Sequence, residues 1–174
     1  GLLGLWESSM ETLAQMLAAV LIALLIGIPA GILAGRSKRV QAVFAPILDV
    51  MQIMPTFAYL APMTLLFGIG IPSATVATLI YAIPPAIRIT SLGIRGVPAA
   101  TMEAAESLGS TRWQTLSKVQ LPLPRRTIGI GVNQTIMMAL SMAVITALIG
   151  APALGADVLR ALQQVNVGQA FQAG

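Results

Sequence analysis

The stretch Glu103 to Pro122, EAAESLGSTRWQTLSKVQLP, decides how the rest of this sequence is interpreted. It carries charges of both signs, in a chain that is otherwise strongly apolar. Residues 99–108 are mostly good helix formers, and Pro98 before them suits the first turn of a helix. Gly109 can adopt the left-handed conformation that ends a helix at little steric cost. The stretch therefore predicts a short helix that ends at Gly109.

A second short helix is predicted directly after this glycine. Thr111 and Gln114 have the spacing of a capping box, which allows a helix to begin at once. Helical periodicity places four side chains on one face of it, namely Trp113, Leu116, Val119 and Gln120. Two Leu-Pro pairs, at 121–122 and 123–124, then stop the helix. The prediction is a polar helical hairpin between membrane spans. It is either a docking element or a solvated connection without a partner.

The order of residues in the hairpin resembles a known motif. It consists of Glu103-Ala104-Ala105, three further residues, Gly109, nine further residues and then Val119-Gln120-Leu121-Pro122. This pattern resembles the EAA loop of ABC importer permeases, in which Ile is usual where Val119 stands. Three other stretches are similar to the permease subunit of glycine betaine/proline betaine importers: MQIMPTFAYLAP (51–62), YAIPPAIRITSLGIRGVP (81–98) and GVNQTIMMALSMAVI (131–145). The resemblance covers roughly residues 10–170.

The resemblance implies an all-α, polytopic membrane protein with an importer-permease core and cytoplasmic coupling helices. It implies a second permease copy, forming a homodimer, and ATPase subunits that carry ATP and Mg²⁺. A substrate-binding protein or domain outside the cell would deliver the solute. The location implied is the inner membrane of a prokaryote. The residues that would dock the ATPase are Glu103, Ala104, Ala105, Glu106, Gly109 and Arg112.

Composition independently indicates a membrane protein. Apolar residues make up 56% of the chain, charged residues 9%, and the mean hydropathy is +0.85, whereas soluble domains carry about 25% charged residues. There is no cysteine and no histidine. These absences exclude disulfides and thiolate metal sites, and they remove the usual general base of neutral-pH catalysis. We expect no enzyme activity, cofactor or metal in this chain.

Three charge-free windows locate the membrane spans. They cover residues 12–35, 50–87 and 127–156, which are 24, 38 and 30 residues long. About 20 apolar residues cross the hydrocarbon core as a helix, so the middle window can hold two spans joined by a turn at 68–73. Four spans are predicted, at about 11–35, 46–67, 72–89 and 126–149. Buried helices of a soluble protein are disfavoured, because each run is too long and too uncharged.

The distribution of basic residues predicts the orientation. Nine of the ten lie between spans one and two, or between spans three and four or at their ends: Arg36, Lys38, Arg39, Arg88, Arg95, Arg112, Lys118, Arg125 and Arg126. Positive charge is retained in the cytoplasm, so the coupling loop, about 95–124, is predicted to be cytoplasmic. The net charge of +4 thus follows the membrane boundary and predicts no nucleic-acid partner.

The whole chain, 1–174, is predicted to form a single transmembrane domain. The number of spans predicts on which side of the membrane its last segment lies. The tail at 151–174, with Arg160, is expected to be an external or re-entrant segment. Four spans that begin outside also end outside, whereas permeases of the resembled type end in the cytoplasm. We therefore expect a final span to lie beyond this sequence.

Small residues and prolines predict how the spans pack. Gly27, Gly31 and Gly35 repeat every four residues, which is typical of close helix packing in membranes, although a lipid-facing coincidence has the same spacing. Pro55 and Pro62 are expected to kink the second span. Such a kink suits a helix that lines a path, and equally a simple bend without a transport role.

Polar side chains inside the spans are candidates for a substrate path. The polar ones are Gln52 and Tyr59 in the second span and Asn133, Gln134 and Ser141 in the fourth, and Met138 adds a soft, adaptable surface on the same helical face as Gln134 and Ser141. Polar groups within membranes usually face the bundle interior, but they also form hydrogen bonds between helices. Aromatic residues, which favour quaternary ammonium groups, make up only 5% of the chain. The sequence therefore predicts no aromatic cage, in keeping with selectivity on a separate binding protein.

The energy source is predicted to lie on another chain. No span centre holds a carboxylate suited to proton coupling, and Asp49 is expected to be solvated or paired. The two lysines, Lys38 and Lys118, do not follow glycine, so no phosphate-binding GxxxxGK[ST] loop is possible. We predict an ATP-driven importer permease for glycine betaine or proline betaine. The alternatives are a regulated pore and an importer of choline, carnitine or an amino acid.

Overall fold

The computed structural model describes residues 2–146, and every regular element in that range is a helix. The elements are α1 (Leu2–Arg36), α2 (Lys38–Ile53), α3 (Thr56–Phe67), α4 (Ile71–Arg95), α5 (Ala99–Ser107), α6 (Arg112–Thr115), the π-helix η1 (Leu116–Gln120) and α7 (Arg125–Thr146). The all-α prediction is confirmed for this range. The predicted tail and the last residues of the fourth span lie outside the described residues.

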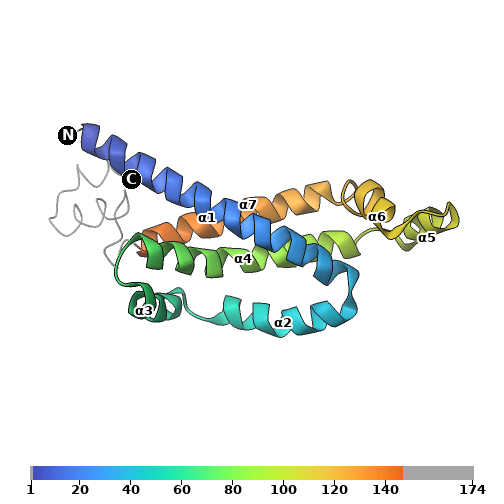
Figure 1. Ribbon diagram of the computed structural model, residues 1–174, viewed down its shortest axis with the longest axis horizontal. Helices are drawn as coiled ribbons and strands as arrows, with labels where there is room; N and C mark the ends of the chain where they lie inside the picture. Colours follow the sequence, from blue (N-terminus) through green and yellow to red (C-terminus); the bar gives the residue numbers. More distant parts are fainter. Residues whose placement is uncertain (1, 147–174) are drawn as a thin grey trace.

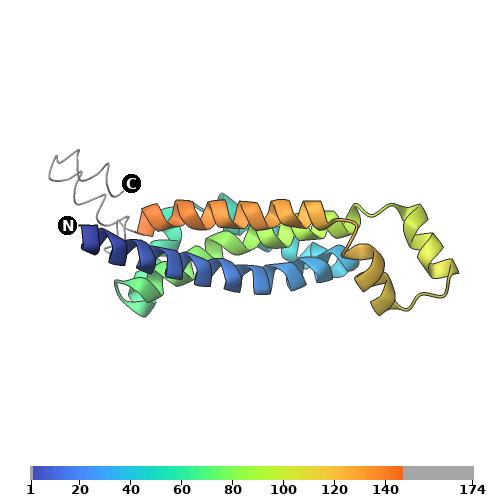
Figure 2. The same ribbon diagram turned by 90° about the horizontal axis from the view of Figure 1, so that it is seen from above.

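The long helices form an elongated bundle (Figure 1). Three are long and apolar enough to cross a membrane: Gly4–Arg36, Ile71–Arg95 and Arg125–Thr146. The hairpin of α5 and α6 projects beyond one end of this bundle, and the N-terminus lies at the other end (Figure 2). The third predicted span, 72–89, is therefore part of a longer helix that continues to Arg95.

The second predicted span, 46–67, is divided into two helices at the proline where a kink was expected. The chain is already helical from Lys38, and α2 and α3 are separate helices that meet at a bend of 95°. Met54 between them is extended, with φ −61° and ψ 133°. Pro55 is the cause, because it lacks an N–H donor and disfavours helical geometry in the residue before it. Together the two helices can account for at most one broken span.

Close packing of α1 on α4 confirms the interpretation of the glycine series. A Cβ atom added at Gly27 would lie 2.5 Å from Ala86 Cβ, and one at Gly31 would lie 2.6 Å from Thr90 Cβ. One at Gly35 would lie 2.7 Å from the Ile94 Cβ. These separations leave no room for a side chain on α1. The two backbones therefore approach each other along two helical turns, as small residues permit in membrane bundles.

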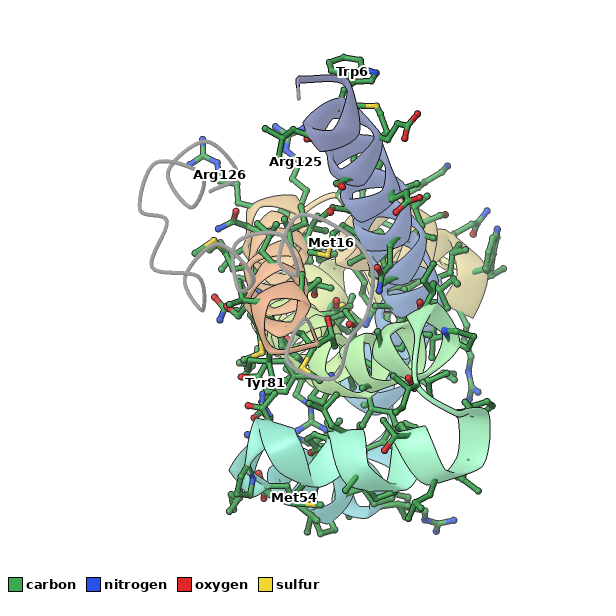
Figure 3. All side chains as sticks on the ribbon, turned by 90° about the vertical axis from the view of Figure 1, so that its left-hand side faces the viewer. Trp6, Met16, Met54, Tyr81, Arg125 and Arg126 are labelled. Atoms are coloured by element: carbon green, nitrogen blue, oxygen red, sulfur yellow. The ribbon has the colours of Figure 1, made fainter. Side chains whose placement is uncertain are left out.

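Helix α4 is the centre of the bundle, because it contacts α1, α2, α3 and α7. Its contact with α7 is also close: a Cβ atom at Gly131 would lie 3.2 Å from Ile89 Cβ. One apolar cluster joins α1, α4 and α7 through Met16, Ala82 and Ala139, and Figure 3 shows Met16 between α1 and α7. Helices α1, α4 and α7 therefore form one tightly packed block.

Candidate coupling and transport site

The hairpin begins with a helix whose end explains the spacing of the EAA stretch. The Gly109 N–H donates to Glu106 O at 2.9 Å, and the Ser110 N–H donates to Ala105 O at 3.1 Å. Gly109 has φ +75°. These two bonds and the left-handed residue form a Schellman motif, which closes a helix by pairing its last carbonyls. The four-residue separation of Ala105 and Gly109 is therefore the geometry of this turn.

The second half of the hairpin starts with the predicted capping box. Gln114 N donates to Thr111 Oγ1 at 3.3 Å, and Thr111 N donates to Gln114 Oε1 at 2.9 Å. Helix α6 then widens into η1, in which Leu121 N donates to Leu116 O, five residues earlier, at 2.9 Å. Backbone bonds thus hold the Gly109 half of the turn and side-chain bonds hold the Thr111 half, so local bonds define the shape of the hairpin.

The four side chains predicted to share one face of the second helix differ in exposure. Leu116 and Gln120 are buried and Val119 is half-buried, but the Trp113 side chain is 72% exposed. The inward face instead continues through Thr115. The physical reason is the wider π turn, which brings residues 116 and 120 onto the same side while residue 113 points away.

Five of the six docking candidates lie on the surface of the hairpin. Glu103, Ala104, Glu106, Gly109 and Arg112 are exposed, and Ala105 is buried. Two large apolar side chains accompany them, Leu108 and Trp113, and both are exposed. Leu108 was not among the residues predicted to dock a partner, and Trp113 was predicted only to share a face with Leu116, Val119 and Gln120. The surface thus combines charged and small groups with two apolar side chains, and of its residues Trp113 and Arg112 are of the types enriched at protein interfaces.

The hairpin is bonded to the end of the bundle. Arg36 Nη2 at the end of α1 donates to Arg112 O at 3.3 Å. Nearby, Arg95 Nη2 donates to Ala34 O at 3.0 Å and so joins α4 to α1. A cleft of about 790 Å³ lies between the hairpin and the turn from α1 to α2, and Glu106 and Arg112 line it.

Basic residues gather at this same end of the molecule. They lie at the end of α1, the start of α2, the end of α4, the hairpin and the start of α7: Arg36, Lys38, Arg39, Arg95, Arg112, Lys118, Arg125 and Arg126. Glu7 and Glu11 lie near the opposite end, in the first turns of α1. This asymmetry of charge follows the long axis of the bundle (Figure 1).

Arg88 was predicted to lie at the end of the third span, and helix α4 continues beyond it. It lies inside α4, seven residues before Arg95, which is about 10 Å along the helix. Its Nη2 donates to Asp49 Oδ1 of α2 at 2.5 Å. The expectation of a paired Asp49 is confirmed. Because α2 begins at Lys38 rather than at residue 46, Asp49 lies about three turns into this helix, and the pair joins α2 to α4 with side chains that are 39% exposed for Arg88 and 56% for Asp49.

The six predicted path residues do not form one cluster. Gln52 is exposed near the end of α2, and on α7 Asn133, Gln134 and Ser141 are exposed while Met138 is half-buried. Helix α2 contacts α1 and α4, whereas α7 contacts α1, α3 and α4. On α7, Asn133, Gln134 and Ser141 make up a polar strip on the outer face of the packed block, interrupted by the exposed apolar side chains of Ile136, Met137 and Leu140.

Tyr59 occupies a different place from the other path candidates. It is buried in a cluster with Leu60, Ala77 and Met142, and its hydroxyl donates to Met51 O. This bond crosses the break between α2 and α3 and pairs a carbonyl in the last turn of α2. Its observed contacts are structural. No group of three or more His, Cys, Asp or Glu side chains within residues 2–146 could hold a metal ion.

Comparison with known proteins identifies the family. Residues 27–173 match the family described as the binding-protein-dependent transport system inner membrane component. The chain belongs to this family. It is therefore part of a multi-pass inner-membrane component of a transport system, and the observed helices agree with that assignment.

The relatives are named as permease proteins of transport systems for glycine betaine, proline betaine or trimethylamine N-oxide. The chain is 49% identical over 172 residues to the glycine betaine transport system permease protein OpuAB of Bacillus subtilis, and 48% identical over 174 residues to the glycine betaine/proline betaine permease protein ProW of Escherichia coli. It is 47% identical over 173 residues to the trimethylamine N-oxide permease protein TmoV of Pelagibacter ubique. These matches cover 99%, 100% and 99% of this chain and 61%, 49% and 24% of the relatives. The chain thus spans only part of their length.

A solved structure supports the fold. An inward-facing form of the MetNI methionine ABC transporter aligns with a TM-score of 0.83 at 20% identity, over 94% of this chain and 83% of that chain. The helix arrangement is therefore that of an ABC importer permease.

Proposed function

We propose that the chain is the membrane-spanning part of an ATP-driven importer that moves glycine betaine-type zwitterions into the cell by alternating access. The named substrates of OpuAB, ProW and TmoV support this substrate class, since all are small neutral molecules that hold opposite charges. The basic end of the bundle faces the cytoplasm in this proposal, because positively charged residues are retained there. The hairpin at that end is then cytoplasmic.

The observation that carries the proposal is the rigid, exposed hairpin. Its surface presents Glu103, Ala104, Glu106, Gly109 and Arg112 beyond the end of the bundle (Figure 2). We infer that an ATPase subunit, which binds ATP and Mg²⁺, receives this surface. The small Ala104 and Gly109 permit close approach, while Leu108 and Trp113 supply apolar contact area.

A displacement of the hairpin has two routes into the bundle. The chain runs directly from η1 through two Leu-Pro pairs into α7, and Arg36 bonds α1 to Arg112 O. Because α1, α4 and α7 form one block, both routes drive the same body. We therefore expect ATP-driven motion to turn this block as a unit.

A second permease copy and an external binding protein complete the proposed importer. The polar strip of Asn133, Gln134 and Ser141 on α7 is exposed in the single chain. Exposed polar groups in hydrocarbon are costly, so a second copy facing this strip would enclose them around a path. Met138 on the same helix would add an adaptable apolar contact.

The decisive experiment is Gly109→Val in the complete complex, reconstituted in lipid vesicles. Valine is strained at φ +75°, at a cost of about 1–3 kcal/mol, so the hairpin must change shape. We expect ATP-driven uptake of labelled glycine betaine to fall about tenfold or more, while the complex remains assembled. Gly4→Val is the matched control, since that helical position in α1 has no atom within 4 Å of an added Cβ.

Three results would contradict the proposal at different levels. Equal uptake by the Gly109→Val and Gly4→Val complexes would remove the hairpin from coupling. Passage of glycine betaine without ATP would indicate a regulated pore. ATP-driven transport of choline, carnitine or an amino acid, with none of betaine, would retain the mechanism and change the substrate.

A further inference from the structure

A cavity between α1, α2 and α4 lies within the bundle, separate from the hairpin and from the polar strip on α7. Its volume is about 290 Å³. The side chains that matter for its chemistry are Gln41, Phe44 and Asp49 of α2 and Arg88 and Ser91 of α4. Pockets for drug-sized ligands begin at about 300 Å³, so this cavity suits a smaller solute.

Two hydrogen-bond donors on residues that line this cavity are buried without a partner among the described residues. They are Arg88 Nε and Ser91 Oγ. Ser91 is only 6% exposed. The two residues are three positions apart on α4 and therefore share a helical face. Buried polar groups are nearly always paired, so a ligand that accepts two hydrogen bonds would satisfy both.

The surrounding charges determine which ligand fits. Arg88 uses Nη2 for Asp49, so its Nε–H remains available for a second carboxylate. That carboxylate would also accept from the Ser91 hydroxyl. The second oxygen of Asp49 can then face a positive group, and the Phe44 ring in the same cavity can contact a quaternary ammonium through its face.

Charge balance favours a zwitterion over an ion. Arg88 and Asp49 already neutralise each other, and an additional net charge inside a membrane bundle is costly. We propose that this cavity binds a small betaine, with its carboxylate on Arg88 Nε and Ser91 Oγ and its ammonium between Asp49 and Phe44. The identity of the solute rests on the proposed function. A phospholipid headgroup with phosphate and quaternary ammonium has the same chemistry and is the second possible source.

A thiol protection experiment tests the site, because the printed sequence contains no cysteine. Ala45→Cys places a thiol in the cavity lining. Val43→Cys, on the same helix but outside that lining and well exposed, is the matched control. The complete complex, free of other reactive thiols, is held in phosphatidylglycerol nanodiscs and labelled with a small maleimide. We expect glycine betaine to slow labelling only at Ala45→Cys, whereas acetate and choline alone do not.

Two further variants define the recognition. Ser91→Ala removes one donor, and Arg88→Lys retains the charge but removes Nε–H. Each variant should raise the betaine concentration that gives half protection by about tenfold. This is the smaller end of the effect expected when one hydrogen bond to a charged group is lost. Equal protection in both variants and the parent would overturn the assigned contacts. An unchanged protein melting temperature in Ser91→Ala would confirm that its effect is local.

Parallel measurements identify the source of the ligand. They also distinguish a failure of this site from a failure of the proposed function. Protection by phosphatidylcholine added to the nanodiscs, without a response to betaine, would assign the same chemistry to a lipid headgroup. Protection by neither would overturn the site. If the complex imports betaine with ATP but the Ala45→Cys thiol is unprotected, the proposed function stands and only this site fails. If the thiol is protected but no betaine is imported, the site stands and the proposed function fails.

Discussion

The two sides of α4 differ in how they hold their neighbours. Toward α1, the glycines at 27, 31 and 35 leave no space for an added Cβ atom. Toward α2, a cavity of about 290 Å³ opens, and one ion pair between Arg88 and Asp49 bridges the helices. Helix α4 therefore has a rigid contact with α1, called the tight seam, and a loosely packed contact with α2, called the loose seam.

The contrast indicates where the molecule can change shape. Densely packed interiors are not continuously deformable, because small displacements create clashes or voids. The α1–α4 seam therefore moves as a unit. At the α2–α4 seam, partly exposed charges and empty volume allow α2 to shift with the loss of few contacts. An alternating-access cycle would use the loose seam and preserve the tight one.

The largest effect is predicted for filling the tight seam with Gly31→Leu. A Cβ atom at this position would already lie 2.6 Å from Thr90 Cβ and 2.7 Å from Ile87 O. Overpacking of this kind destabilises by about 3 kcal/mol, which we expect as a lower free energy of unfolding in mixed micelles. Gly4→Leu, in an open part of the same helix, should be neutral. Equal stability of the two variants would show that the seam is not rigid.

A smaller effect is predicted for the ion pair at the loose seam. In a double-mutant cycle of Asp49→Ala and Arg88→Ala, we expect a coupling energy of about 1 kcal/mol. The reason is exposure, since the side chains are 39% exposed for Arg88 and 56% for Asp49. The measurement is the free energy of unfolding of the parent, both single variants and the double variant. A coupling of several kcal/mol would make this seam as firm as the other.

Local rules of sequence predicted the hairpin and the tight seam well. The Schellman turn at Gly109 and the capping box at Thr111 depend on residues within five positions of one another. The glycine repeat at 27–35 specifies a helix face by itself. In each of these cases, the chemistry of neighbouring residues determines the geometry, so no knowledge of distant segments is required.

Features that depend on distant packing were not predicted. Proline at position 55 indicated a kink, but not that α2 and α3 would meet at 95°. Arg88 was assigned to a span end, and a charge count does not show that Asp49 of α2 lies opposite it. Tyr59 was selected as a path residue for its polar hydroxyl, yet this hydroxyl donates to Met51 O across the break between α2 and α3. Polarity indicates a need for a partner and does not identify which partner satisfies it.

The smallest effect is predicted for Tyr59→Phe, which tests how the loose helix is tethered. The ring packs in the core cluster with Ala77 and Met142, and its hydroxyl holds Met51 O in the last turn of α2. Phenylalanine retains the packing and loses one hydrogen bond, at about 0.5 kcal/mol. We expect faster amide exchange in the last turn of α2 and an almost unchanged global stability, because the tight seam is untouched. Tyr81→Phe, in a ring that packs against the same cluster, is the control. If exchange rose equally in both variants, or across α1 and α4, the tether would belong to the rigid block, and the division of α4 into two sides would be wrong.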